Sequence, residues 1–355
     1  MKTIFGERLR QARIMKGLSL RGLSEMLDGL VSYNALSKYE KGEMMPSSNV
    51  LVALANILGR NPDFFFRSSS VSFSGLEFRK CKTKLSKTDE HRICEESRDY
   101  FERYLQIEDV LDMRTEFKNP LKGHVVSSAE DAERAAKQLR RAWKLGLAPL
   151  PNIYDMLESK GVVINETGAP KSFDGLSAMA GDIPVIVLAK HLDSNLARKR
   201  LTMIHELGHL LLETAPEVTP KETEKLMNHF AGAFLMPGRV LLERLGKKRK
   251  KVSVQEYLDL KMVFGISIAA LVMRADQLGI VPKSYTKNFW MLRKKWGWDK
   301  RGEPGDDDYN KKDGEHSHRL SQMVRHALTE GMISASKAAS LLNCSVYELQ
   351  EEHDI

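Results

Sequence analysis

The sequence predicts a multidomain, mainly α-helical protein with one α+β domain in its middle. The chain of 355 residues is longer than a single hydrophobic core usually organises, so two or three domains are expected. Apolar residues recur at helical spacing over most of the chain. Two β-branched runs, 161–164 and 183–188, are bounded by glycine or proline and lie between helical patterns, which is typical of an α+β unit.

Composition narrows the functional classes. The net charge of +8 favours an acidic partner, nucleic acid first, although a solvated basic surface explains it equally well. No apolar run is long enough to cross a membrane, and the first residues lack the apolar core of a signal peptide. The three cysteines are scattered, which suits a reducing compartment and makes disulfides improbable. We therefore expect a cytoplasmic protein that has no membrane partner.

Residues 1–67 have the pattern of a small all-α domain. Ser19 is a suitable N-cap for a helix over 20–27, which Asp28-Gly29 ends. Ser32 then caps a helix over 33–41, and another helix follows the turn at Pro46. Two helices joined by a short turn, with a polar outer face on the second, form the helix-turn-helix design. A helical bundle that does not bind DNA is the alternative.

In the helix-turn-helix design, the second helix enters the major groove and its early polar residues meet base edges. In this chain that helix carries Leu36 and Tyr39 on the inward face. The residues that we expect to contact bases or phosphates are Ser32, Tyr33, Asn34, Ser37 and Lys38.

The same segment resembles the helix-turn-helix domain of Xre-type phage repressors. The matching residues are Gly6-x-Arg8-Leu9-Arg10, Gly17-Leu18-Ser19, Leu36-Ser37-Lys38-Tyr39-Glu40-Lys41-Gly42 and Pro46-Ser47-Ser48. Leu20 departs from the family, which often has a glutamine there, and the loop over 28–31 is longer than the minimal form. The resemblance implies binding to double-stranded operator DNA, usually as a homodimer on paired half-sites.

A connector follows over residues 68–118. Apolar residues alternate over 71–78 as in a pair of short strands, and a long charged helix is predicted from Asp89 to Met113. This helix could be a dimerisation arm, or it could pack on its own domain. The pattern leaves both interpretations open.

The predicted α+β region begins with two helices and ends with a helix that carries a histidine and glutamate motif. Ser128 suits the N-cap of a helix over 129–143, and a second helix runs from 152 to 157. The two β-branched strands come next, followed by a helix over 198–212. That helix contains His205-Glu206-Leu207-Gly208-His209. Strands that lead into a helix with this motif predict an active site on the helix.

The motif has the chemistry of a zinc peptidase. Residues four apart share one helix face, so His205 and His209 can bind one metal ion. Glu206 can reach a water on that ion and accept its proton. A hydrolytic zinc site takes three protein ligands and leaves one position open, so one ligand is missing.

A second helix over 221–235 offers the third ligand. Glu224 lies one turn before Asn228, whose amide could hold the outer nitrogen of a ligating histidine. His229 points roughly a hundred degrees away from them and ranks second. Spacing leaves the choice open. The candidates downstream of the motif are Glu213, Glu217, Glu222, Glu224 and His229.

Residues 129–290 resemble the ImmA/IrrE family of metallo-endopeptidases. The matching stretches are Phe173-Asp174-Gly175-Leu176-Ser177-Ala178, Arg200-x-x-x-Ile204-His205-Glu206-Leu207-Gly208-His209 and Glu224-x-x-x-Asn228-x-Phe230-Ala231-x-x-Phe234-Leu235-Met236-Pro237. The resemblance implies an α+β zincin-like metallopeptidase domain over 119–290, with Glu224 as the third zinc ligand. It implies peptide hydrolysis with Glu206 as proton acceptor. For oxyanion stabilisation, Arg200, His191 and His229 all stay open.

The segment 291–355 is predicted to be a charged linker and a small helical unit for packing or partner binding. The dense basic run over 245–251 is interpreted as a solvated loop, and contact with DNA is the alternative. His316 and His318 lack a third partner for a metal site.

Two functions follow from these resemblances. The first is a DNA-binding regulator whose zinc domain cleaves a repressor-like protein. The second is an antitoxin and autorepressor of a toxin–antitoxin or prophage locus, which acts by binding operator DNA and a cognate toxin with little or no proteolysis. A sensor whose metal site binds a small ligand is a weaker third.

Overall fold

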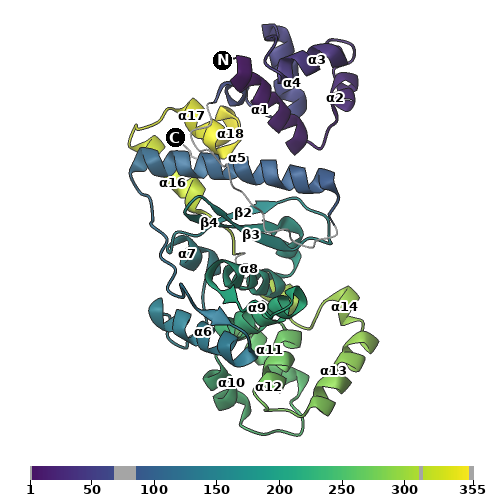
Figure 1. Ribbon diagram of the computed structural model, residues 1–355, viewed down its shortest axis with the longest axis vertical. Helices are drawn as coiled ribbons and strands as arrows, with labels where there is room; N and C mark the ends of the chain where they lie inside the picture. Colours follow the sequence, from purple (N-terminus) through teal and green to yellow (C-terminus); the bar gives the residue numbers. More distant parts are fainter. Residues whose placement is uncertain (1, 68–84, 312–314, 352–355) are drawn as a thin grey trace.

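The computed structural model describes residues 2–67, 85–311 and 315–351 and confirms the expected fold class. A small helical domain lies at one end, with the long helix α5 beneath it (Figure 1). A small sheet follows below α5, and further helices form the opposite end (Figure 1). The strands predicted over 71–78 lie outside the described residues.

The N-terminal domain contains the three predicted helices, α2 (Leu20–Met26), α3 (Tyr33–Glu40) and α4 (Ser48–Leu58). It also contains α1 (Lys2–Met15) and the 3-10 turn η1 (Pro62–Phe66), which were not predicted above. Ser19 and Ser32 cap α2 and α3 through their side chains, as the sequence predicted. A Cβ at Gly6 would come within 2.5 Å of the Tyr39 carbonyl oxygen, so only glycine lets α1 approach α3 this closely.

Helix α5 (Lys87–Leu111) packs within its own chain against several elements. It contacts α1, β2 and the C-terminal helices α16 (Arg319–Thr329) and α17 (Ala335–Leu342). Arg8 Nη1 on α1 lies 2.6 Å from Glu102 Oε2 on α5, and both side chains are buried. Of the two interpretations of this helix, packing on its own chain is therefore observed. The dimerisation arm stays a prediction.

The central α+β unit is built on a three-stranded sheet of order β2–β4–β3. β2 (Val163–Thr167) is parallel to β4 (Ile183–Ala189), and β3 (Gly175–Ala180) is antiparallel to β4. β3 was not among the predicted strands, because its glycine and alanine residues have low β propensity and its pairing with β4 decides its conformation. The flanking elements are β1 (Val125–Val126), α6 (Ala129–Ala142), α7 (Ile153–Glu158), η2 (Lys190–Ser194), α8 (Leu196–Leu211), β5 (Glu213–Thr214) and α9 (Pro220–Leu235).

The remaining helices complete two cores on opposite sides of the sheet. One core joins α6, α8 and α9 to the helices that follow them. The other joins α5 and the outer sheet face to the C-terminal helices, which return from the far end of the chain. The helices not yet given are α10 (Gly238–Leu245), α11 (Val254–Phe264), α12 (Ile268–Gln277), α13 (Lys283–Lys295), α14 (Trp298–Arg301), α15 (Asp306–Asn310) and α18 (Val346–Glu351). Within the described residues, no helix has the length and apolarity of a membrane span.

Candidate metal centre

Two helices, α8 and α9, bring the motif residues together. Asn195 caps α8, and Thr219 begins α9 with a reciprocal capping pair to Glu222. A Cβ at Gly208 would lie 2.9 Å from Met227 Sδ and 3.1 Å from Phe230, so glycine at this position allows the two helices to pack closely. This close packing sets Glu224 on α9 opposite the histidines of α8.

His205, His209 and Glu224 converge at one point. The Nε2 atoms of the two histidines are 3.2 Å apart. Glu224 Oε2 lies 3.2 Å from His205 Nε2, and Glu224 Oε1 lies 3.5 Å from His209 Nε2. Tetrahedral zinc, with bonds of about 2.0–2.1 Å, separates its ligand atoms by roughly 3.3–3.5 Å. The two imidazoles and the carboxylate therefore fit zinc in donor type and in spacing.

The charges of the cluster favour a cation. Two hydrogen bonds from His205 and His209 hold the pKa of Glu224 well below its ordinary value. Burial lowers the pKa of His205, but the hydrogen bond to Glu224 and the charge of Glu206 outweigh burial and raise it. The same carboxylates that stabilise an imidazolium would stabilise a bound metal ion.

Glu206 is buried beside the cluster and has a partner that sequence reasoning missed. Ser177 Oγ on β3 donates a hydrogen bond to Glu206 Oε2 over 2.8 Å. The two side chains are 29 positions apart, and no helix or strand periodicity connects them. The signal that could have pointed to Ser177 is its place in the stretch 173–178, which resembled the metallo-endopeptidase family.

Asn228 lies where its spacing from Glu224 suggested. Its Oδ1 is 3.2 Å from His205 Nδ1, and its Nδ2 donates to the Glu224 carbonyl oxygen over 2.9 Å. The amide thus contacts the outer nitrogen of a histidine of the cluster while it is itself held on α9. Such a contact fixes the tautomer and ring orientation of a ligating histidine.

Other sequence candidates lie away from the cluster. His229 Nε2 contacts Glu133 Oε2 on α6 at 3.1 Å. Arg200 is buried, pairs with Glu315 and donates to the Leu150 carbonyl oxygen. His191 Nε2 lies 3.5 Å from an oxygen of Asp174. The contacts just given for these three candidates for oxyanion stabilisation do not involve the described cluster. The carboxylates of Glu213, Glu217 and Glu222 do not belong to it either.

A second group of possible metal ligands is explained by an ion pair with a lysine. Atoms of Glu166, Asp193 and His316 lie within 4.8 Å of one another. However, the buried Lys199 Nζ is 2.6 Å from both Glu166 Oε1 and Asp193 Oδ1. The lysine ammonium therefore already provides the positive charge in this group.

The predicted DNA-contact residues lie on α3 and at its N-cap. Tyr33, Asn34 and Lys38 are exposed, Ser37 is half-buried, and Leu36 and Tyr39 face the core. The Ser32 hydroxyl accepts a hydrogen bond from the Ala35 amide over 3.2 Å, so it serves the helix cap. α3 thus has the polar outer face expected of a recognition helix.

Comparison with known families agrees with both parts of this structure. Residues 157–276, which include the cluster, match the family described as the IrrE N-terminal-like domain. Residues 9–65 match the helix-turn-helix family. The chain carries a helix-turn-helix domain and an IrrE N-terminal-like domain. We refer to the second as the IrrE-like domain.

The similar curated proteins support only the helix-turn-helix assignment. The SPbeta prophage-derived uncharacterized HTH-type transcriptional regulator YonR of Bacillus subtilis (strain 168) is 34% identical over 70 residues, which is 20% of this chain and 63% of that protein. Two uncharacterized HTH-type transcriptional regulators, from Rickettsia prowazekii and Rickettsia conorii, are 39% identical over 64 residues, or 18% of this chain. The chain covers 48% and 50% of these two proteins. No solved structure matches the chain significantly.

Proposed function

We propose that the protein is a DNA-binding transcriptional regulator whose IrrE-like domain is a zinc-dependent endopeptidase acting on a regulatory protein. One observation carries the enzymatic part: His205, His209 and Glu224 converge at zinc spacing with the buried carboxylate of Glu206 beside them. If the cluster served only as a structural ion pair, it would not need the additional buried carboxylate of Glu206.

The residues divide the chemistry among them. Zinc, when bound, supplies a Lewis acid that lowers the pKa of water and polarises a peptide carbonyl. Glu206 accepts the proton of the attacking water and returns it to the leaving nitrogen. Ser177 donates a hydrogen bond to one carboxylate oxygen of Glu206, so the other oxygen accepts the proton. Asn228 orients His205.

The sheet edge supports a peptide as substrate. β3 pairs only with β4 in the described sheet, so its other side is an edge. An extended peptide can add to such an edge through main-chain hydrogen bonds. Because Ser177 of β3 contacts Glu206, a peptide along β3 would pass beside the proton acceptor.

The N-terminal domain supports operator DNA as a partner. The exposed residues of α3 fit major-groove contact, and repressors of this design bind paired half-sites as homodimers. We infer such a homodimer, and a cytoplasmic location in which the operator is accessible.

A comparison of wild type with Glu206→Gln tests the proposal. Both proteins are expressed in a host strain, and new protein N-termini are mapped by mass spectrometry. We expect at least one site-specific cleavage that needs wild type, with equal zinc content and equal operator binding in the two proteins. Cleavage that persists in Glu206→Gln would contradict the enzymatic role.

The same pair of proteins decides the antitoxin and autorepressor alternative. In that case operator repression and neutralisation of a cognate toxin survive Glu206→Gln, and no new N-terminus depends on wild type. The sensor hypothesis requires instead that a small ligand of the metal site change operator affinity.

A further inference from the structure

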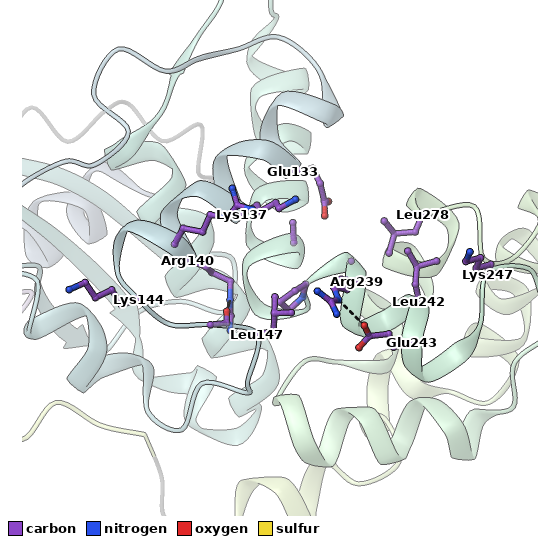
Figure 2. A pocket seen from close by; sticks show the side chains of 15 residues that line it. Glu133, Lys137, Arg140, Lys144, Leu147, Arg239, Leu242, Glu243, Lys247 and Leu278 are labelled. Atoms are coloured by element: carbon purple, nitrogen blue, oxygen red, sulfur yellow. Dashed lines mark hydrogen bonds and ion pairs between the residues drawn. The ribbon is translucent and has the colours of Figure 1, made fainter.

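A cavity with a largely apolar lining lies away from the metal centre, in a groove between α6 and α10 (Figure 2). Its volume is about 1040 Å³. Ala233, at one wall, follows Glu224 by nine residues on α9, roughly 13 Å along the helix. The apolar lining residues are Leu147, Ala233, Pro237, Leu242 and Leu278.

The cations around this groove are of two kinds. Arg140 is buried and donates to the carbonyl oxygens of Gly146, Phe234 and Ala148, so its hydrogen bonds are used within the fold. Burial lowers its pKa to about 10. In contrast, the exposed side chains of Lys137, Arg141, Lys144 and Lys247 have no recorded acidic partner among the described residues.

The two acidic side chains of the groove are already neutralised. Glu133 forms a two-bond ion pair with Arg274, at 2.8 and 3.0 Å. Glu243 accepts a hydrogen bond from Arg239 over 2.8 Å (Figure 2). The groove therefore presents an apolar floor between rims of uncompensated positive charge.

We propose that this groove binds an acidic amphipathic helix of a partner protein. Such a helix would place its apolar face on the leucine-lined floor and its carboxylates against the rims. Lys137 and Arg141 are one helical turn apart, and Lys144 and Lys247 extend the charge along and across the groove.

Size and charge spacing favour a helix over a small anion. Pockets for small molecules span roughly 300–1,000 Å³, and this cavity lies at the upper limit. A single anionic group would meet one or two of the cations, whereas a row of carboxylates at i and i+4 meets the whole row. A DNA backbone has the charge but offers nothing apolar for the leucine-lined floor.

The test measures binding of one defined probe to the full-length protein. The probe is a fluorescein-labelled 14-residue peptide that carries leucines at helical i, i+3, i+4 and i+7 spacing and glutamates on the flanks. Fluorescence anisotropy should give a Kd on the order of 10 µM. A peptide with lysine in place of each glutamate should not bind. Absence of binding by the acidic peptide would overturn the proposal.

Matched variants locate the binding. Lys137→Glu/Arg141→Glu should weaken the acidic peptide about tenfold. Lys294→Glu/Lys295→Glu makes the same charge change at exposed residues of α13 outside the groove and should leave affinity unchanged. Leu147→Ser, at a half-exposed position, should weaken the peptide without unfolding the protein. Equal losses in both double variants would show general charge attraction and overturn the proposal.

A duplex of random sequence separates a partner helix from nucleic acid. If Lys137→Glu/Arg141→Glu weakens the duplex more than the peptide, the groove is a DNA surface and the proposal fails. If the duplex is affected equally by the two double variants while the peptide is affected only by the groove variant, the partner is a protein segment.

Discussion

Ser177 on β3 donates a hydrogen bond to Glu206 on α8 over 2.8 Å, and both side chains are buried. This contact ties the edge strand of the sheet to the helix that carries His205 and His209. A carboxylate that is buried without any partner would be costly, so the serine both satisfies and orients Glu206.

Ser177→Ala should therefore slow peptide cleavage by roughly tenfold to a hundredfold, since a hydrogen bond to a charged group contributes roughly 1.5–3 kcal/mol. Zinc content should not change, because the hydrogen bond of Ser177 is made to Glu206 and not to one of the three candidate ligands. Ser177→Thr, which keeps the hydroxyl, should restore part of the rate. The rate is measured with the substrate found by N-terminal mapping. A rate that is unchanged in the alanine variant would exclude a positioning role for the serine.

Glu158 should make the fold sensitive to pH. Burial raises the pKa of this carboxyl from 4.5 to about 7, and the neutral form is favoured in the folded protein. Its stabilising contribution is full below pH 4.5 and is lost as pH rises to about 7, by at most about 1.4 kcal/mol per pH unit. Glu158→Gln, which stays neutral, should match wild type near pH 4.5 and become relatively more stable up to pH 7.

Urea unfolding of both proteins at each pH measures this difference. The control is Glu217→Gln, which changes an exposed carboxyl on the loop before α9. A constant difference between wild type and Glu158→Gln across this range would show that Glu158 titrates as an ordinary carboxyl.

Two residues of α3 should affect DNA binding differently. Lys38→Ala removes a cation expected at a phosphate, so it should weaken all sequences alike and reduce the salt slope by about 1. Asn34→Ala should cost about 1–3 kcal/mol on the operator and little on random duplexes. Anisotropy with an operator selected from random duplexes measures both. Lys122→Ala, an exposed lysine outside the N-terminal domain, should have no effect.

Local spacing was enough to predict two pairs of residues that each share a helix face, but not the complete cluster. The four-residue spacing of His205 and His209, and of Glu224 and Asn228, describes one helix face each, so helical geometry alone predicts their common orientation. What spacing could not decide was which acidic residue of the second helix meets the histidines. Close packing at Gly208 decides it, and that depends on tertiary structure.

Contacts between distant segments could not be predicted from the sequence. The pairing of Arg8 with Glu102, and the return of α16 and α17 to α5, join residues far apart in the chain. The same holds for the groove between α6 and α10, because its two rims come from separate helices. The basic run over 245–251 was interpreted as a solvated loop, and residues 246–251 do form a largely exposed loop; its Lys247 also lines that groove, and its Arg249 pairs with Glu256.

Metal analysis of the purified protein tests the central claim most directly. We expect inductively coupled plasma mass spectrometry to find one zinc per chain in wild type and in Glu217→Gln. In Glu224→Gln the zinc content should fall to a small fraction, while circular dichroism shows the fold retained, because Glu224 is exposed and its loss leaves the core intact. Equal zinc in Glu224→Gln and wild type, or no zinc in wild type after zinc addition, would contradict a metal centre at His205, His209 and Glu224.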